Sequence, residues 1–309
     1  MPDRRLQPFR EIWRKLNGLA LYRLCDTDQP SARVLLGHGN GLTAATCQAL
    51  AQALSRHFEV IAFDSRGHGA SDVPSTFHRV NNWDRFADDQ LMLSNALSKL
   101  PELAPLPLHL VVHSINAVAA LRSLNRNPRA FQSYQLLDPV LIPIGQSMGL
   151  SIARPLGLAA RLHPLAAGAA KRRTQWPSFA DAEQYLIGRK SLANWPTEAV
   201  QAYIYSGMKP SARGSVVLRC PAGHEAKYFV SMPPCYLDRP INQGALCHII
   251  RGEHGATNLD RLDRVQRRHN NLSVTTMAGH DHFGLITHPD ETTATIIRSV
   301  TSTNEQTSP

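Results

Sequence analysis

The sequence lacks any apolar run of the roughly 18 residues that a membrane-spanning helix needs. Its longest region of low charge, residues 138–160, is interrupted by prolines, glycines and Arg154. Charges also occur throughout the first 24 residues, so the N-terminus has no apolar core of signal-peptide type. We therefore expect a cytoplasmic protein with no transmembrane segment.

Cysteine is scarce, with five residues in a chain of 309: Cys25, Cys47, Cys220, Cys235 and Cys247. Their number is odd, they are widely spaced, and none forms a C-x-x-C pair. This pattern argues against a disulfide framework. It predicts free thiols in a reducing compartment.

Aromatic residues make up only 6% of the chain, and no ladder of them runs among the basic residues. The formal net charge is +9, but Lys and Arg are scattered along the sequence. Binding of single-stranded nucleic acid requires both a basic groove and stacking aromatics. We therefore expect no nucleic-acid partner, and we interpret the excess charge as a solvated basic surface.

Short apolar runs alternate with helical patterns, which is typical of an α/β protein with a mostly parallel central sheet flanked by helices. Because each run is nearly all apolar, it resembles a strand that is covered on both faces. The predicted strands span residues 32–37, 59–64, 106–113, 133–138, 245–251 and 272–277. The predicted helices span residues 46–58, 83–100, 115–124 and 289–300.

This alternation stops between residue 143 and about residue 240, where helical fragments such as 179–187 and 198–205 lie among prolines and glycines. We interpret this stretch as an insertion between two strands of one sheet. The expected organisation is a core formed by residues 1–142 and 240–300, an inserted helical cap over 143–239, and a flexible tail over 301–309.

A buried strand runs directly into a helical pattern in the segment LHLVVHSINAVAALRSL, residues 108–124. Ser114 stands at the junction. A tight strand-to-helix turn exposes a serine hydroxyl above the sheet edge and directs the first N–H groups of the helix to the same space. This arrangement makes Ser114 a candidate nucleophile. The alternative is that Ser114 is an ordinary helix N-cap.

The segment resembles the nucleophile turn of the α/β-hydrolase superfamily, written G-x-S-x-G, although Val112 and Asn116 replace the two glycines. Two further segments support the resemblance: HGNG at residues 38–41 and DSRGHGAS at residues 64–71. They are similar to the superfamily's oxyanion loop and to a structural loop after a strand. The resemblance implies an α/β-hydrolase fold, with the backbone N–H groups of Asn40 and Ile115 forming the oxyanion hole.

In this superfamily the catalytic base follows the last strand, where the present sequence has AGHDHFGLITHPDE, residues 278–291. The resemblance favours His282, and His280 is the alternative. A metal site on this His-x-His pair is not indicated, because no third ligand stands at a suitable spacing. The resemblance implies no cofactor.

The imidazole of the predicted base needs an acidic residue at its other ring nitrogen, which fixes its tautomer and stabilises the imidazolium. Acidic residues stand at the ends of two predicted strands. These are Asp138, in LLDPVLIP, and Glu253, in RGEHGATN. The superfamily most often places the acid in the second loop, but glycine occupies the expected position there. We favour Asp138 and keep Glu253 as the alternative.

The resemblance therefore implies a serine hydrolase that cleaves a carboxylic ester or related acyl bond through a Ser-His-acid triad and an acyl-enzyme. Alternatives are a carbon–carbon bond hydrolase or perhydrolase with the same triad, or an inactive hydrolase-fold binding protein.

Residues 143–213 carry nine basic and three acidic residues. If these basic side chains face the substrate, they favour an anionic or lipid-like ester. Otherwise they form a solvated exterior. The sequence does not indicate an oligomeric state.

Overall fold

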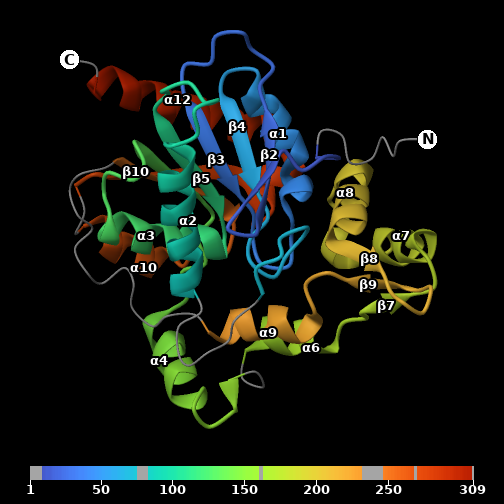
Figure 1. The fold of residues 1–309 in the computed structure, drawn as a ribbon. Coiled ribbons are helices and arrows are strands. Elements are labelled where there is room, and N and C mark those ends of the chain that lie inside the picture. Colours follow the sequence, from blue (N-terminus) through green and yellow to red (C-terminus); the bar gives the residue numbers. More distant parts are fainter. Residues whose placement is uncertain (1–8, 75–82, 160–162, 232–245, 268–269, 308–309) are drawn as a thin grey trace.

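An eight-stranded β-sheet crosses the centre of the structure (Figure 1). The computed structural model describes residues 9–74, 83–159, 163–231, 246–267 and 270–307. The strands of the sheet are β1 (Arg14–Leu16), β2 (Leu19–Leu24), β3 (Arg33–Gly37), β4 (Glu59–Phe63), β5 (Leu108–His113), β6 (Ser133–Leu137), β10 (Leu246–His254) and β11 (Leu272–Asp281). Their spatial order is β1-β2-β4-β3-β5-β6-β10-β11. The last six strands in this order are parallel to one another, and all six predicted strands are confirmed.

The first two strands form an antiparallel hairpin that the apolar runs do not predict. Strand β1 has the sequence RKL and is too short and too polar to form an apolar run. The signal for the hairpin is its loop, because Asn17 and Gly18 both have positive φ angles, 46° and 82°. Asn-Gly with this backbone is typical of a two-residue hairpin turn.

Helices cover both faces of the sheet (Figure 1). On one face, α2 (Trp83–Leu97), α3 (Ile115–Arg126) and α10 (Leu259–Gln266) pack into one apolar cluster. On the other face, a second cluster contains the 3-10 helix η2 (Ala44–Cys47), α1 (Gln48–Ser55), α11 (Gly284–Thr287) and α12 (Pro289–Thr307). The strands between them are nearly all buried, as expected for parallel strands covered on both sides.

The chain between β6 and β10 contains the predicted helices and also a small sheet. Its helices are α4 (Ile144–Ala153), α6 (Pro164–Lys171), α7 (Phe179–Ile187), the 3-10 helix η3 (Lys190–Leu192), α8 (Thr197–Gly207) and α9 (Ala222–Val230). Strands β7 (Gln175–Trp176), β8 (Met208–Pro210) and β9 (Val216–Leu218) form a separate antiparallel sheet in the order β7-β9-β8. Strands of two or three residues are too short to show an alternating pattern, which explains why the sequence predicts helices alone here. The expected boundary near residue 240 lies outside the described residues.

The C-terminal helix corrects the prediction of a flexible tail over 301–309. Helix α12 continues to Thr307. Thr303 is buried, and its hydroxyl donates to the Ser299 carbonyl within the helix. The polar composition of residues 301–307 hides this continuation, because no apolar side chain marks the helical face there.

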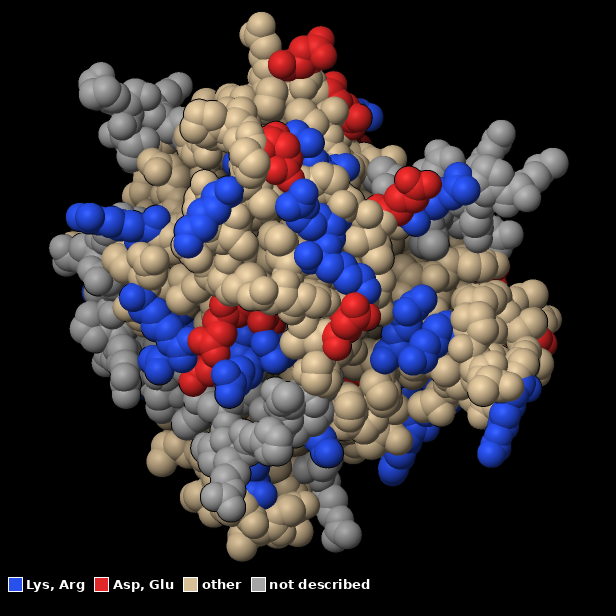
Figure 2. Space-filling model, viewed as in Figure 1, with Lys and Arg blue, Asp and Glu red and all other residues tan. Residues whose placement is uncertain are grey.

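Basic side chains are dispersed over the face seen in Figure 2, with acidic side chains among them. Figure 2 shows no single large basic patch on this face. Within the described residues, none of the helices combines the length and apolar character needed to cross a bilayer.

Candidate active site

Three of the predicted site residues meet at the carboxyl edge of the sheet. Ser114 follows β5, Asp138 follows β6 and His282 follows β11. Because these strands are parallel, their carboxyl ends lie along one edge, which brings together residues 168 positions apart in the chain.

Ser114 occupies a strained turn between β5 and α3. Its φ and ψ angles are 58° and −115°, a conformation that is costly for a residue with a side chain. Its backbone N–H donates to the Leu137 carbonyl at 3.0 Å, and α3 begins at the next residue. Ser114 occupies the N-cap position of α3, but its side chain makes no capping hydrogen bond to this helix, and its backbone angles differ from those of an ordinary N-cap residue.

The three side chains form a continuous hydrogen-bonded chain. The Ser114 Oγ lies 3.0 Å from His282 Nε2, and His282 Nδ1 lies 2.5 Å from Asp138 Oδ2. In the arrangement that satisfies both contacts, the hydroxyl donates to Nε2 and the Nδ1–H donates to the carboxylate. This is the geometry in which an imidazole can take a proton from a serine.

The Asp138 carboxylate is buried and held by several donors. The Ala256 N–H donates to Oδ2 at 2.6 Å, and the Gly252 N–H and Thr257 hydroxyl donate to Oδ1 at 3.3 Å each. Burial acts to raise the pKa of Asp138, but the hydrogen bond to His282 and the charge of His282 outweigh it. The pKa therefore lies below its ordinary value, and the carboxylate stays ionised.

Gly255 makes room for this carboxylate. A Cβ atom at residue 255 would lie 2.1 Å from Asp138 Oδ1, so no side chain fits there. This is the loop in which the superfamily most often carries its acid. The Asp138 carboxylate, at the end of β6, occupies the space that a side chain at residue 255 would take.

The two alternative residues lie elsewhere. Glu253 is exposed, and its carboxylate accepts a hydrogen bond from the Gly279 N–H at 2.8 Å. His280 contacts Glu291 at 3.1 Å and stacks on His288, with ring centroids 4.1 Å apart. Neither side chain hydrogen-bonds to the side chain of Ser114 or His282.

The two residues that replace glycine in the turn motif are accommodated by their neighbours. Val112 is fully buried and pairs in register with Gly37 of β3, where an added Cβ would lie 3.0 Å from the Val112 side chain. Asn116 is also buried, and its Nδ2 donates to the His38 carbonyl at 2.6 Å and to Ser65 Oγ at 2.9 Å. The asparagine therefore ties the start of α3 to the loop after β3.

His113 packs beneath the His282 ring, with ring centroids 4.6 Å apart. Its Nε2 lies 2.9 Å from the His282 carbonyl oxygen and donates to it. Burial, followed by the nearby His282, lowers the pKa of His113 to about 3. His113 is therefore a neutral group that fixes the backbone of His282.

The predicted oxyanion loop is held by two buried, neutral histidines. His38 Nε2 accepts from the Ser65 N–H at 2.9 Å, and His68 Nε2 accepts from the Gly41 N–H at 3.1 Å. Burial lowers the pKa of His38 to about 4, and burial together with His38 lowers the pKa of His68 to about 3. The loop carrying Asn40 is thus fastened to the DSRGHGAS segment by acceptors that titrate well below neutral pH.

A pocket of about 250 Å³ lies beside the Ser114 hydroxyl and is mostly apolar. Residues up to 142 contribute Asn40, Trp83, Ser114, Ile115, Val140 and Ile142 to its lining, and the loop after β10 contributes Ala256. Residues 143–231 contribute Gln146, His163, Pro164, Leu165 and Phe229. Asn40 and Ile115 are thus adjacent to the pocket that contains Ser114. No Lys, Arg, Asp or Glu occurs among the lining residues that the structure describes.

Helix α9 contacts the predicted oxyanion loop directly. The Glu225 carbonyl accepts from Asn40 Nδ2 at 3.1 Å, and an added Cβ at Gly41 would lie 3.0 Å from the Glu225 carboxylate. Glu225 is buried and pairs with Arg172 at 2.6 Å, and Arg172 also donates to the Tyr203 hydroxyl at 3.0 Å. The Arg172 charge is therefore neutralised within the protein.

The position of Ser114, Asp138 and His282 on the parallel sheet matches a known architecture. A model of the alpha/beta hydrolase family matches residues 34–295. The chain belongs to this family.

Among curated relatives of this alpha/beta hydrolase is the 2-(acetamidomethylene)succinate hydrolase of Mesorhizobium japonicum. It is 28% identical over 254 residues, which cover 81% of each chain. The crystal structure of an E-2-(acetamidomethylene)succinate hydrolase superposes with a TM-score of 0.68 at 22% identity, covering 91% of this chain and 94% of that one.

Two further solved structures share the fold. A peroxisomal alpha-beta-hydrolase of Saccharomyces cerevisiae has a TM-score of 0.70 at 16% identity, covering 94% of this chain and 83% of that one. An esterase of Mycobacterium tuberculosis has a TM-score of 0.66 at 18% identity, covering 92% and 89% respectively. The family match and this shared fold show that the chain is an enzyme of hydrolase type.

Sequence reasoning did not identify His113, or the pairing of Arg172 with Glu225, as part of the site of this hydrolase. Only the place of His113 directly before Ser114 was a signal for its role. Glu225 and Arg172 lie 53 residues apart and meet through helices of the inserted region, so no local pattern reveals their contact.

Because several histidines are buried and neutral, we predict that the free energy of unfolding of this hydrolase falls in acid. Unfolded histidines take up protons below a pKa of about 6.5, whereas His38, His68 and His113 resist protonation in the folded state, so stability falls as pH falls. Each of these histidines should lower the free energy of unfolding by about 1–2 kcal/mol at pH 5 relative to pH 8. We expect urea denaturation of His68→Gln to show a smaller acid-induced loss than wild type.

Glutamine can accept the Gly41 hydrogen bond without titrating in this range. The matched control is His57→Gln, because His57 is exposed, and this variant should keep the full acid-induced loss. An unchanged acid response in His68→Gln would contradict the prediction.

Proposed function

We propose that this chain is a serine hydrolase that cleaves a carboxylic ester through an acyl-enzyme. The observation that carries the proposal is the hydrogen-bonded chain from Ser114 through His282 to Asp138, with contacts of 3.0 and 2.5 Å. The Ser114 hydroxyl lies beside the apolar pocket, where a substrate carbonyl can reach it. The free thiols of Cys25, Cys47, Cys220 and Cys247 are consistent with a cytoplasmic location.

In the proposed first step, His282 Nε2 takes the proton of the Ser114 hydroxyl while Oγ attacks the ester carbonyl carbon. Asp138 remains ionised and stabilises the imidazolium through Nδ1–H. The imidazolium then gives its proton to the leaving alcohol. Water enters, loses a proton to His282 and releases the acid from Ser114.

The oxyanion is proposed to accept hydrogen bonds from the backbone N–H groups of Asn40 and Ile115. Ile115 is the first residue of α3, so its N–H has no partner within the helix. Asn40 stands in the loop that His68 and Asn116 brace. Donors that are fixed before the reaction stabilise developing charge without reorganising.

The pocket favours an uncharged acyl group of modest size. Its volume of about 250 Å³ holds on the order of eight water-sized groups at about 30 Å³ each. We further propose that residues 143–239 act as a cap, because α4, α6 and α9 supply one wall of this pocket.

A second candidate is hydrolysis of an amide or carbon–carbon bond in a small dicarboxylate. The relative that is 28% identical is named for 2-(acetamidomethylene)succinate, a compound with an acetamido group and a succinate unit. The apolar lining of the described pocket favours the ester, because it offers no cation to a carboxylate.

An inactive binding protein is the third possibility, and labelling with a fluorophosphonate tests it. An activated serine attacks the phosphorus of such a probe, so wild-type protein should be labelled at one residue. Ser114→Ala should not be labelled. The matched control, Ser231→Ala, changes another buried serine and should label like wild type. Wild-type protein that stays unlabelled would refute an active Ser114.

The proposed acid is tested by comparing Asp138→Asn with Glu253→Gln. Asparagine keeps the shape but removes the charge behind His282, so the turnover rate should fall by about 10⁴-fold. Glu253→Gln should hydrolyse esters at nearly the wild-type rate. Melting curves followed by circular dichroism should show that both variants remain folded. The assignment is wrong if Glu253→Gln suffers the large loss instead.

A substrate panel separates the ester and dicarboxylate candidates. We expect p-nitrophenyl esters with acyl chains of about four to eight carbons to be cleaved faster than the palmitate, because the pocket is small. We expect 2-(acetamidomethylene)succinate to react more slowly than these esters. Val140→Phe should narrow the pocket and shift the preference to shorter chains.

The matched control for Val140→Phe is Leu259→Phe, since Leu259 is 54% exposed and lies on α10 away from the pocket. Its preference for chain length should equal that of wild type. Faster hydrolysis of 2-(acetamidomethylene)succinate than of every ester would favour the second candidate.

A further inference from the structure

A row of polar side chains crosses the sheet near the amino ends of its parallel strands. It consists of Ser133 and Gln135 of β6, His248 of β10, and Ser273 and Thr275 of β11, and is here called the polar row. His248 pairs in register with Gln135 on one side and with Ser273 on the other, so these three side chains share one face. Parallel strands covered by helices are normally apolar on both faces.

Two buried members of the polar row have unused hydrogen-bonding atoms. Gln135 is 1% exposed, and its Nε2 donates to Ser133 Oγ at 3.0 Å, but its Oε1 has no partner among the described residues. His248 is 8% exposed, and its Nε2 lies 2.8 Å from the Thr275 hydroxyl, while its Nδ1 has no partner there. Burying such atoms without partners costs free energy. They therefore indicate a polar occupant.

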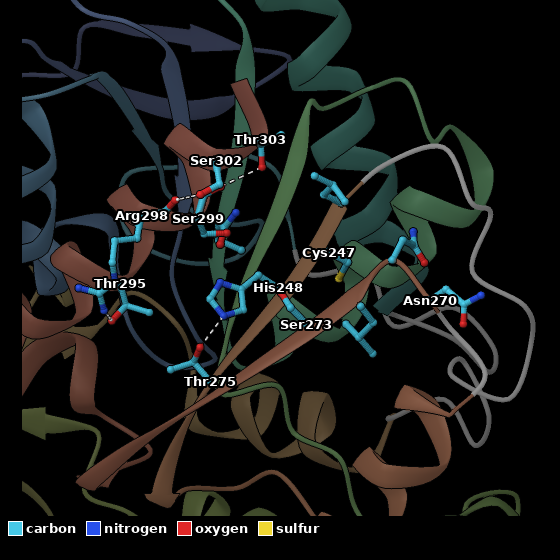
Figure 3. A pocket seen from close by; sticks show the side chains of 14 residues that line it. Cys247, His248, Asn270, Ser273, Thr275, Thr295, Arg298, Ser299, Ser302 and Thr303 are labelled. Carbon is cyan, nitrogen blue, oxygen red and sulfur yellow. Dashed lines mark hydrogen bonds between the residues drawn. The ribbon is translucent and has the colours of Figure 1, made fainter. Parts of the chain in front are cut away.

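The polar row opens into a pocket of about 440 Å³ between the sheet and α12. Figure 3 shows Arg298 and Ser299 of α12 across the pocket from His248, with the Arg298 side chain extending toward Thr295. Arg298 Nη2 donates to Thr295 Oγ1 at 3.0 Å, and Arg298 is an exposed residue of the pocket lining. No Asp or Glu occurs among the lining residues that the structure describes, so none of them neutralises this guanidinium.

This pocket is separate from the candidate active site. Its strand residues include Cys247 and Leu272, at the amino ends of β10 and β11, whereas Asp138 and His282 lie beyond the carboxyl ends of strands. The two pockets have no lining residue in common.

We propose that this pocket is a second binding site, which takes a small hydroxylated carboxylate. Arg298 pairs with the carboxylate, for which a guanidinium is the preferred partner. The ligand hydroxyl donates to Gln135 Oε1, which can only accept, and His248 Nδ1 completes the polar contact. Burial, followed by the charge of Arg298, lowers the pKa of His248 to about 4, so Arg298 supplies the positive charge at neutral pH.

Isothermal titration calorimetry with citrate, which carries carboxylates and one hydroxyl, tests the proposal. We expect one saturable site per chain in the wild-type protein. Arg298→Gln should weaken citrate binding about tenfold, as expected for loss of one charge-assisted contact. Tricarballylate, which lacks the hydroxyl, should bind several-fold more weakly than citrate to wild type, because Gln135 Oε1 then lacks its donor.

Arg264→Gln is the matched control, because Arg264 is an exposed arginine of α10 outside the pocket and its loss changes the net charge equally. It should leave citrate binding unchanged. Equal weakening in Arg264→Gln and Arg298→Gln would mean general attraction to a basic surface and would overturn the site. The absence of saturable citrate binding, or equal binding of tricarballylate, would overturn it as well.

Ester hydrolysis by Arg298→Gln should match that of wild type, since Arg298 contacts neither Ser114 nor its pocket. The proposal does not depend on the ester hydrolase activity. A protein that binds citrate but hydrolyses no ester would support the second site and contradict the proposed function alone.

Discussion

The contact between Asp138 and His282 joins parts of the chain that are 144 residues apart, and much of the site geometry depends on it. Three donors from the end of β10 and the loop after it hold the carboxylate, and the carboxylate in turn orients the imidazole toward Ser114. Each of these groups lies at the end of a parallel strand. The register of the sheet, rather than any flexible loop, therefore sets the distances between them.

A second set of contacts braces the region in which the oxyanion is expected to form. Asn116 and His68 hold the loop after β3 from the side of the core, and Glu225 holds it from helix α9. The bracing histidine is neutral, and Glu225 is paired with Arg172. Such contacts fix the backbone without placing a competing charge beside the proposed oxyanion hole.

The main features of the fold could be predicted from the sequence because buried parallel strands leave clear apolar runs, as in residues 33–37 and 108–113. The strained turn at Ser114 was also visible, as a strand that leads directly into a helix. The choice between Asp138 and Glu253 could not be made from sequence, because it depends on which side chain reaches His282 across the sheet edge. Strand β1 of the hairpin and the helix beyond residue 300 were missed, since their residues are mostly polar and show no apolar periodicity.

The pairing of Gly37 with Val112 bears on how such enzymes are recognised. Gly37 leaves space on β3 for the side chains of Phe63 and Val112, so the room beside the strand-to-helix turn comes from the neighbouring strand instead of from the turn itself. Vacant volume is then a property shared by two strands that are adjacent in space and distant in sequence. A search pattern that demands glycine on both sides of the serine would overlook proteins in which the glycine stands on the neighbouring strand.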